Sequence, residues 1–269
     1  MTTTTTHATV EQSLIPVLHS EGWRGGLGNL IRKEIGQWWG TRSWWIQTVI
    51  WLALLNGITT LAMLEAPMAA EEMAALAVQT FLMVGATAIG IGVVLSIQGA
   101  VVGEKELGTA AWVMSKPASR ASFVLAKLLA NTMGFLVTAV VIPSIVFIVE
   151  ARYLLTAPVD YTQFALGVAV VALSVVFYVV LTIALGCMFK GRGPVAGIGI
   201  GLILIGQFFK GMLPLSVVLV TPWLLGDVAS SFALASLPVF NRMIPIIVTA
   251  VATFALMWAA VWRFGREEF

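Results

Sequence analysis

Long apolar stretches without charged side chains alternate with short polar segments along this chain. A helix rises about 1.5 Å per residue, so crossing roughly 30 Å of hydrocarbon takes about 20 residues. Stretches of about this length lie at 44–64, 74–102, 123–149, 161–189, 194–210 and 244–264. The pattern therefore predicts an all-α integral membrane protein with six transmembrane helices.

The apolar segment 211–242 does not fit this pattern, because prolines interrupt it. Pro214, Pro222 and Pro238 oppose a continuous helix, and Asp227 adds a charge. The stretch 211–226 is marginal for a crossing, and counting it as one would place the basic C-terminus outside. We expect short helices that enter and leave the outer leaflet, forming a re-entrant segment between the fifth and sixth spans.

Residues 27–42 precede the first span and carry apolar side chains at near-helical spacing, with polar ones between them. This arrangement is typical of an amphipathic helix in the cytoplasmic interface, with Trp38 and Trp39 at the headgroup level. The alternative is an extension of the first span, which Gly36, Gly40 and Arg42 disfavour. Residues 1–21 are polar and threonine-rich in their first part, so we expect a disordered cytoplasmic tail before a single transmembrane domain over 22–269.

Composition supports a membrane protein and excludes several other classes. Hydrophobic residues make up 59% of the chain and charged residues 10%, whereas a soluble domain carries roughly 25% charged residues. The net charge of +2 is too small to indicate a nucleic-acid partner. The single cysteine, Cys187, excludes an internal disulfide, and both histidines lie in the N-terminal tail, so we expect no metal site.

The basic residues predict the orientation of the spans. One set of polar segments holds most of the 15 lysines and arginines, and the opposite set holds only Arg152, Lys210 and Arg242. This asymmetry places both termini and the loops 103–122 and 190–193 in the cytoplasm, as in a multi-pass protein of the inner (plasma) membrane. The outer loops are short and acidic.

The interiors of the predicted spans lack charged side chains, which argues against an ion-coupled carrier. Lys127 and Lys210 lie near span ends, from which we expect them to reach the interface. The neutral polar residues either line a pathway or form interhelical hydrogen bonds worth about 1 kcal/mol each. They include Asn56, Gln79, Gln98 and Gln207.

The loop 103–122, GEKELGTAAWVMSKPASRAS, is the longest cytoplasmic segment predicted between spans. We expect a short helix over 107–115 that stops before Pro117, then a second helix capped by Ser119 or Ser122. Charged residues at both ends would form a rim around apolar residues, with Trp112 as an anchor. The alternative is an ordinary solvated loop. The loop lacks the lysine that follows the second glycine of a phosphate-binding loop, so we expect no nucleotide site.

The segment GEKELGTAAWVMSKPASRASFVLAKLLAN resembles the cytoplasmic segment between the second and third spans of ABC-2 type transporter permeases. LIRKEIGQWWGTR resembles the interfacial elbow helix of that family, and WRFGREEF resembles its usual ending. A departure is the Met-Ser-Lys sequence before Pro117, where the family is often more apolar. The loop residues that match in order are Glu104, Lys105, Glu106, Gly108, Thr109, Pro117, Ser119, Arg120 and Lys127.

The resemblance implies a permease subunit of an ATP-driven transporter, usually an exporter, without enzymatic activity. It implies a second permease subunit, identical or related, and separate ATPase subunits that carry the ATP and Mg²⁺. A non-transporting membrane anchor or assembly subunit is the alternative. The residues implied in ATPase coupling are Glu104, Lys105, Glu106, Gly108, Thr109, Trp112, Pro117 and Arg120. Those of the elbow helix are Arg32, Lys33, Glu34, Trp38 and Trp39.

Overall fold

The computed structural model describes residues 22–65, 69–115, 118–155, 157–234 and 238–267, and the regular elements within these ranges are all helical. Six segments are long and apolar enough to span a membrane. They are Ser43–Leu64, Ala70–Glu106, Arg120–Leu154, Tyr161–Met188, Arg192–Phe209 and Asn241–Gly265. For the described residues, the prediction of an all-α membrane protein with six helices that are long and apolar enough to span a membrane is confirmed.

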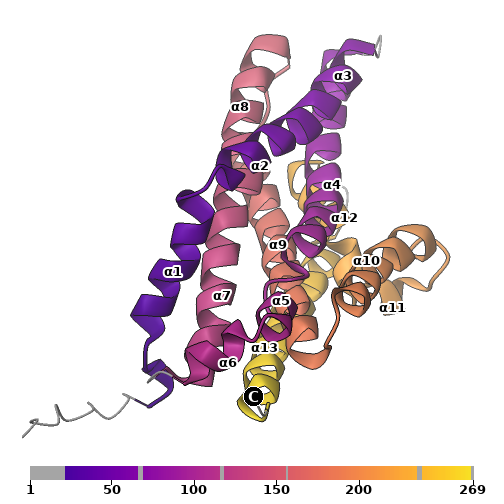
Figure 1. The fold of residues 1–269 in the computed structure, drawn as a ribbon. Helices are drawn as coiled ribbons and strands as arrows, with labels where there is room; N and C mark the ends of the chain where they lie inside the picture. Colours follow the sequence, from indigo (N-terminus) through magenta and orange to yellow (C-terminus); the bar gives the residue numbers. More distant parts are fainter. Residues whose placement is uncertain (1–21, 66–68, 116–117, 156, 235–237, 268–269) are drawn as a thin grey trace, which may run out of the picture.

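The fourth span, α9, is the central helix of the bundle (Figure 1). It packs against α4, α7, α12 and α13, and more of its residues are buried than in the other spans. The phenyl rings of Phe81, Phe147 and Phe164 pack together between the helices, with centroids 4.7–5.7 Å apart. The bounds of these helices are α4 Ala70–Ile97, α7 Arg120–Phe135, α9 Tyr161–Met188, α12 Leu225–Leu234 and α13 Val239–Gly265.

The first and third spans each contain a short π-helical segment. The first comprises α2 (Ser43–Trp51), η2 (Leu52–Asn56) and α3 (Gly57–Glu65). The third comprises α7, η3 (Leu136–Val141) and α8 (Ile142–Leu154). Pro143 has no N–H to donate to the turn before it, which lies in η3. Asn56 donates its amide to the Pro143 carbonyl at 3.2 Å and to Glu150 Oε2 at 2.9 Å, so it ties η2 of the first span to α8 of the third.

The segment after α10 (Arg192–Phe209) contains only short elements in its described part. They are α11 (Leu215–Val218), η4 (Pro222–Leu224) and α12. The indole of Trp223 donates to the Leu202 carbonyl at 2.9 Å and occupies the space that a side chain at Gly206 would fill. Lys210 pairs with Asp227 at 2.6 Å rather than extending to the interface by itself. Placement of this segment in the outer leaflet stays a prediction.

Helix α1 (Leu27–Trp39) is separate from the first span, because residues 40–42 break the helix before α2 begins at Ser43. In Figure 1 it lies beside α7, and the contacts extend to Phe135 at the end of that helix. Its position in the membrane interface stays a prediction. We call the end of the bundle that carries α1, the start of α7 and the end of α13 the basic end. It also carries α5 (Val102–Glu106) and α6 (Thr109–Met114).

Candidate functional site

Three consecutive charged residues of α5 pair with three different parts of the chain. Successive residues of a helix point about 100° apart, so Glu104, Lys105 and Glu106 face in different directions. Glu104 contacts α1 and α7, Lys105 contacts the ends of α9 and α13, and Glu106 contacts the start of α10. The short helix α5 therefore joins most of the elements at the basic end.

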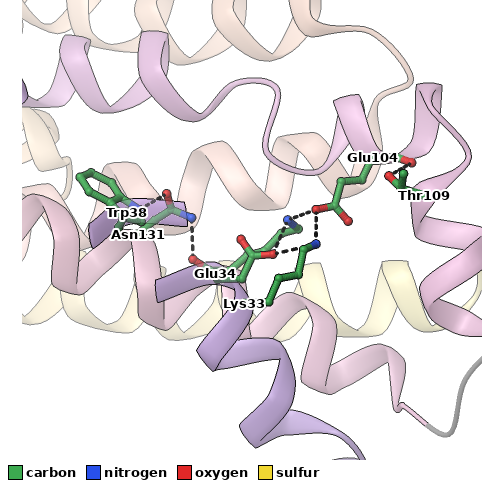
Figure 2. A network of polar contacts seen from close by, with 7 residues as sticks. Lys33, Glu34, Trp38, Glu104, Thr109 and Asn131 are labelled. Atoms are coloured by element: carbon green, nitrogen blue, oxygen red, sulfur yellow. Dashed lines mark hydrogen bonds and ion pairs between the residues drawn. The ribbon is translucent and has the colours of Figure 1, made fainter. Parts of the chain in front are cut away.

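Glu104 belongs to an ion cluster of four side chains, Lys33, Glu34, Glu104 and Lys127. Figure 2 labels the first three. The Lys127 ammonium lies 3.0 Å from Glu34 Oε1 and 2.7 Å from Glu104 Oε1. The Lys33 ammonium lies 2.9 Å from Glu104 Oε1 and 3.4 Å from Glu34 Oε1. Two positive and two negative charges thus compensate each other and join α1, α5 and α7.

The ion cluster is buried on the side of Lys127, whose side chain is 2% exposed, against 7% for Glu34 and 39% for Lys33. The Lys127 ammonium is therefore enclosed by protein rather than exposed at the molecular surface. A charge buried without a partner costs several kcal/mol, but the carboxylates of Glu34 and Glu104 compensate the ammonium within the protein. Lys127 consequently serves as the centre of a helix contact.

Lys33 lies at the more exposed edge of the ion cluster. Burial disfavours its charged form, but hydrogen bonds and attraction from Glu104 and Glu34 outweigh this effect and raise its pKa above 10.5. A lysine with a raised folded-state pKa contributes stability below its unfolded pKa, and this contribution disappears as the pH rises through the folded-state pKa. Lys33 is therefore charged throughout the neutral range.

The contact between α1 and α7 continues one helical turn beyond the ion cluster. Trp38 donates its indole N–H to Asn131 Oδ1 at 3.1 Å, and the Asn131 amide donates to the Lys127 carbonyl at 2.7 Å (Figure 2). The indole of Trp38 lies where any side chain at Gly134 would have to be. Trp38 and Glu34 were predicted as elbow-helix residues, but their pairing with Asn131 and Lys127 was not predicted. Glu34 and Trp38 are four residues apart on one helix, as are Lys127 and Asn131 on the other. This spacing puts each pair on one helix face and was the feature of the sequence that could have predicted the contact.

Lys105 connects the loop to the C-terminal end of α13. Its ammonium lies 2.7 Å from Glu267 Oε2 and donates to the Cys187 carbonyl at 3.1 Å. Arg120, the first residue of α7, donates to the Gly265 carbonyl at 2.7 Å. No local sequence pattern predicts the Glu267 contact, because the partners are 162 positions apart.

Helix α6 and the turn before it carry two exposed apolar side chains, Leu107 and Trp112. Gly108 has φ of 68°, a left-handed conformation that favours glycine, and it separates α5 from α6. Thr109 Oγ1 donates to the Glu104 carbonyl at 3.2 Å. Ala110 and Val113 are buried, whereas Leu107 and Trp112 are 76% and 64% exposed.

This arrangement differs from the expected charged rim around an apolar centre. The side chains of Glu104 and Lys105 are only 16% and 11% exposed and pair within the chain. Glu106 is more exposed and lies 3.5 Å from Arg192, a contact that solvent weakens. The helix expected over 107–115 is observed as α6, and Ser119 caps α7 by accepting from the Ser122 N–H at 2.9 Å. Pro117 lies outside the described residues.

The other predicted residues are dispersed through the fold. Arg32 is exposed, and the rings of Trp39 and Trp44 lie 5.8 Å apart. Gln207 donates to Thr87 Oγ1 at 2.9 Å and so joins α10 to α4. Gln79 and Gln98 contact residues of their own helix, Met83 and Leu95. Asn56 and Gln207 thus form hydrogen bonds between helices. The four neutral residues do not lie together in one site.

A family model described as ABC-2 family transporter protein matches residues 28–222. The chain belongs to the ABC-2 transporter family. The matched range includes α1, the ion cluster and α6, and the comparison with curated proteins gives no significant match. ABC-2 permeases are the membrane subunits of ABC transporters and generally work with an ABC ATPase partner. The resemblance to ABC-2 type permeases is therefore confirmed at the level of the family.

Proposed function

We propose that this ABC-2 permease is the transmembrane subunit of an exporter, driven by separate ATPase subunits that dock on α5 and α6. The observation that carries the proposal is the exposure of Leu107 and Trp112. Both residues follow α5, which forms ion pairs with three parts of the bundle. A large exposed aromatic side chain is typical of an anchor at a protein interface.

In this proposal, the ion cluster transmits a movement of α5 and α6 to α1 and α7. A push on α6 reaches α5 through Gly108, and α5 is ionically linked to α1 and α7 through Glu104. The buried contacts with Lys127 make these three helices move together, since separating the charges is costly. ATP-driven closure of the ATPases would thereby shift α1 and α7, and rearrange a path between this subunit and a second permease subunit, identical or related.

The orientation follows from the same proposal. The basic end carries Arg120, Lys190, Arg192 and Arg263, as cytoplasmic ends of spans commonly do. We place this end, with both termini, on the cytoplasmic side of the plasma membrane. The ATP and Mg²⁺ would then bind the partner ATPases. Lipid surrounds the exposed apolar faces, and nucleic acid has no part in the mechanism.

The experiment that tests the proposal is co-purification of the chain with its ABC ATPase, together with ATP hydrolysis in proteoliposomes. We expect Trp112→Ala to reduce ATPase retention and permease-dependent hydrolysis by roughly tenfold or more, as for loss of an interface anchor. Trp258→Ala is the matched control, because Trp258 is also exposed, at 70%, but lies on α13. Equal retention of the ATPase by both variants would favour the anchor or assembly subunit instead.

A further inference from the structure

A cavity of about 390 Å³ lies at the basic end, directly beside the ion cluster. Its walls come from α1, α2, the junction of α4 and α5, α7 and the start of α10. Trp38, Ile97 and Ala100 provide apolar walls, and Ser43 and Ser96 provide hydroxyl groups. The volume lies within the roughly 300–1,000 Å³ typical of small-molecule sites.

Two buried acceptor atoms of the lining residues lack a partner. Glu104 Oε1 accepts from both Lys33 and Lys127, but Glu104 Oε2 has no hydrogen bond among the described residues. Gln47 Oε1 is also buried and unpartnered within the described part of the chain. Leaving such atoms unsatisfied costs about 1–3 kcal/mol each. These atoms therefore favour a ligand that donates hydrogen bonds.

The guanidinium group of Arg192 provides a positive charge and hydrogen-bond donors in the same cavity. It lies against Gly99 and Gly103, where added Cβ atoms would come within 3.2 and 3.1 Å of it. Its one ion pair among the described residues is the 3.5 Å contact of Nε with Glu106, which leaves the fork of the guanidinium available to an anion. A guanidinium fork matches the geometry of a phosphate group.

The charges that line the cavity sum to zero, since Glu34 and Glu104 stand against Lys127 and Arg192. A zwitterion preserves this balance, whereas an anion alone would face two carboxylates and a cation alone would face two basic groups. We propose that the cavity binds the phosphoethanolamine headgroup of an aminophospholipid. Its ammonium donates to the unpartnered acceptors, and its phosphate accepts from Arg192.

The position of the cavity favours a lipid over a soluble molecule. It lies where the apolar part of α4 ends at Ile97 and where α2 begins, next to Trp38 of α1. Tryptophans gather at this depth, where the headgroups of a bilayer lie. A phosphocholine headgroup has no N–H donor and leaves Glu104 Oε2 unsatisfied, so the site should select ethanolamine over choline.

The test is native mass spectrometry of the purified protein after exchange into phosphatidylcholine, with phosphatidylethanolamine then added. We expect one retained phosphatidylethanolamine per chain and an affinity roughly tenfold above that for phosphatidylcholine, as for loss of a hydrogen bond to a charged group. Gln47→Leu should reduce this preference, because it removes one of the two acceptors for the ammonium. Arg192→Gln should weaken the binding of both lipids, because both carry the phosphate. Both substituted residues lie outside the ion cluster, which avoids the risk that a Glu104 variant fails to fold.

Gln98→Leu and Lys190→Gln are the matched controls, because these residues lie near the same helix ends and do not line the cavity. Both should retain the ethanolamine preference. Equal binding of the two lipids by the wild type would overturn the proposal, because the cavity would then not recognise the ethanolamine group. Soluble phosphoethanolamine that binds as tightly as the lipid, with the same dependence on Gln47 and Arg192, would overturn the lipid assignment.

Discussion

At the scale of residues, the basic end is organised around one buried ammonium group. Lys127 comes after seven residues of α7, where the sequence pattern predicts a snorkelling side chain at a span end. Its burial depends on Glu34, which is 93 positions away, and on Glu104 in a different loop. No local pattern connects these positions, so hydropathy finds the helix boundary but cannot identify the ion cluster.

The buried half of the ion cluster should be more sensitive to substitution than its exposed edge. We expect Lys127→Met to lower the free energy of unfolding by about 3–5 kcal/mol, because Glu34 then lies buried without its closest cation. Lys33→Met removes a half-exposed partner and should cost about 1 kcal/mol or less. Thermal or denaturant unfolding in detergent measures both, and equal losses would contradict the assigned burial.

At the scale of elements, the six spans were predictable because each needs a long apolar run, and the runs are present in the sequence. The break between α1 and α2 was predictable from Gly40 and Arg42. The packing of α1 against α7 was not predictable from the sequence. Its amphipathic pattern is satisfied equally by lipid headgroups and by a protein groove, and the choice depends on Gly134 and Asn131 in another span.

The packing of α1 on α7 makes two glycine positions respond oppositely to alanine. Gly134→Ala should destabilise the protein by about 1–3 kcal/mol, because its Cβ would overlap the indole of Trp38. Gly36→Ala, in the middle of α1, meets nothing within 4 Å and should be neutral or stabilising by up to about 1 kcal/mol. Unfolding of both variants in the same detergent provides the comparison. Similar effects at the two sites would show that α1 does not dock on α7 in solution.

At the scale of the whole molecule, the chain gathers its long-range polar contacts at the basic end. The ion cluster, the Lys105 contacts and the Arg120 bond to Gly265 all lie there and connect α1, α5, α7, α9 and α13. The opposite end has fewer such connections among the described residues, with Asn56 and Glu150 as one example. In the proposed function, this asymmetry places the strongest connections between helices at the end where the ATPases would dock.

The orientation of this asymmetric molecule can be tested by cysteine labelling, because the native Cys187 is fully buried and should contribute little background. Ala70 and Ser115 are both exposed and lie at opposite ends of the bundle, at the start of α4 and just after α6. With the basic end in the cytoplasm, Ala70→Cys should react with a membrane-impermeant maleimide in intact cells. Ser115→Cys should react only after the membrane is permeabilised. The wild type, treated identically, controls for Cys187. Reaction of Ser115→Cys in intact cells would place α6 outside, where no cytoplasmic ATPase reaches it, and docking on Trp112 would then be impossible.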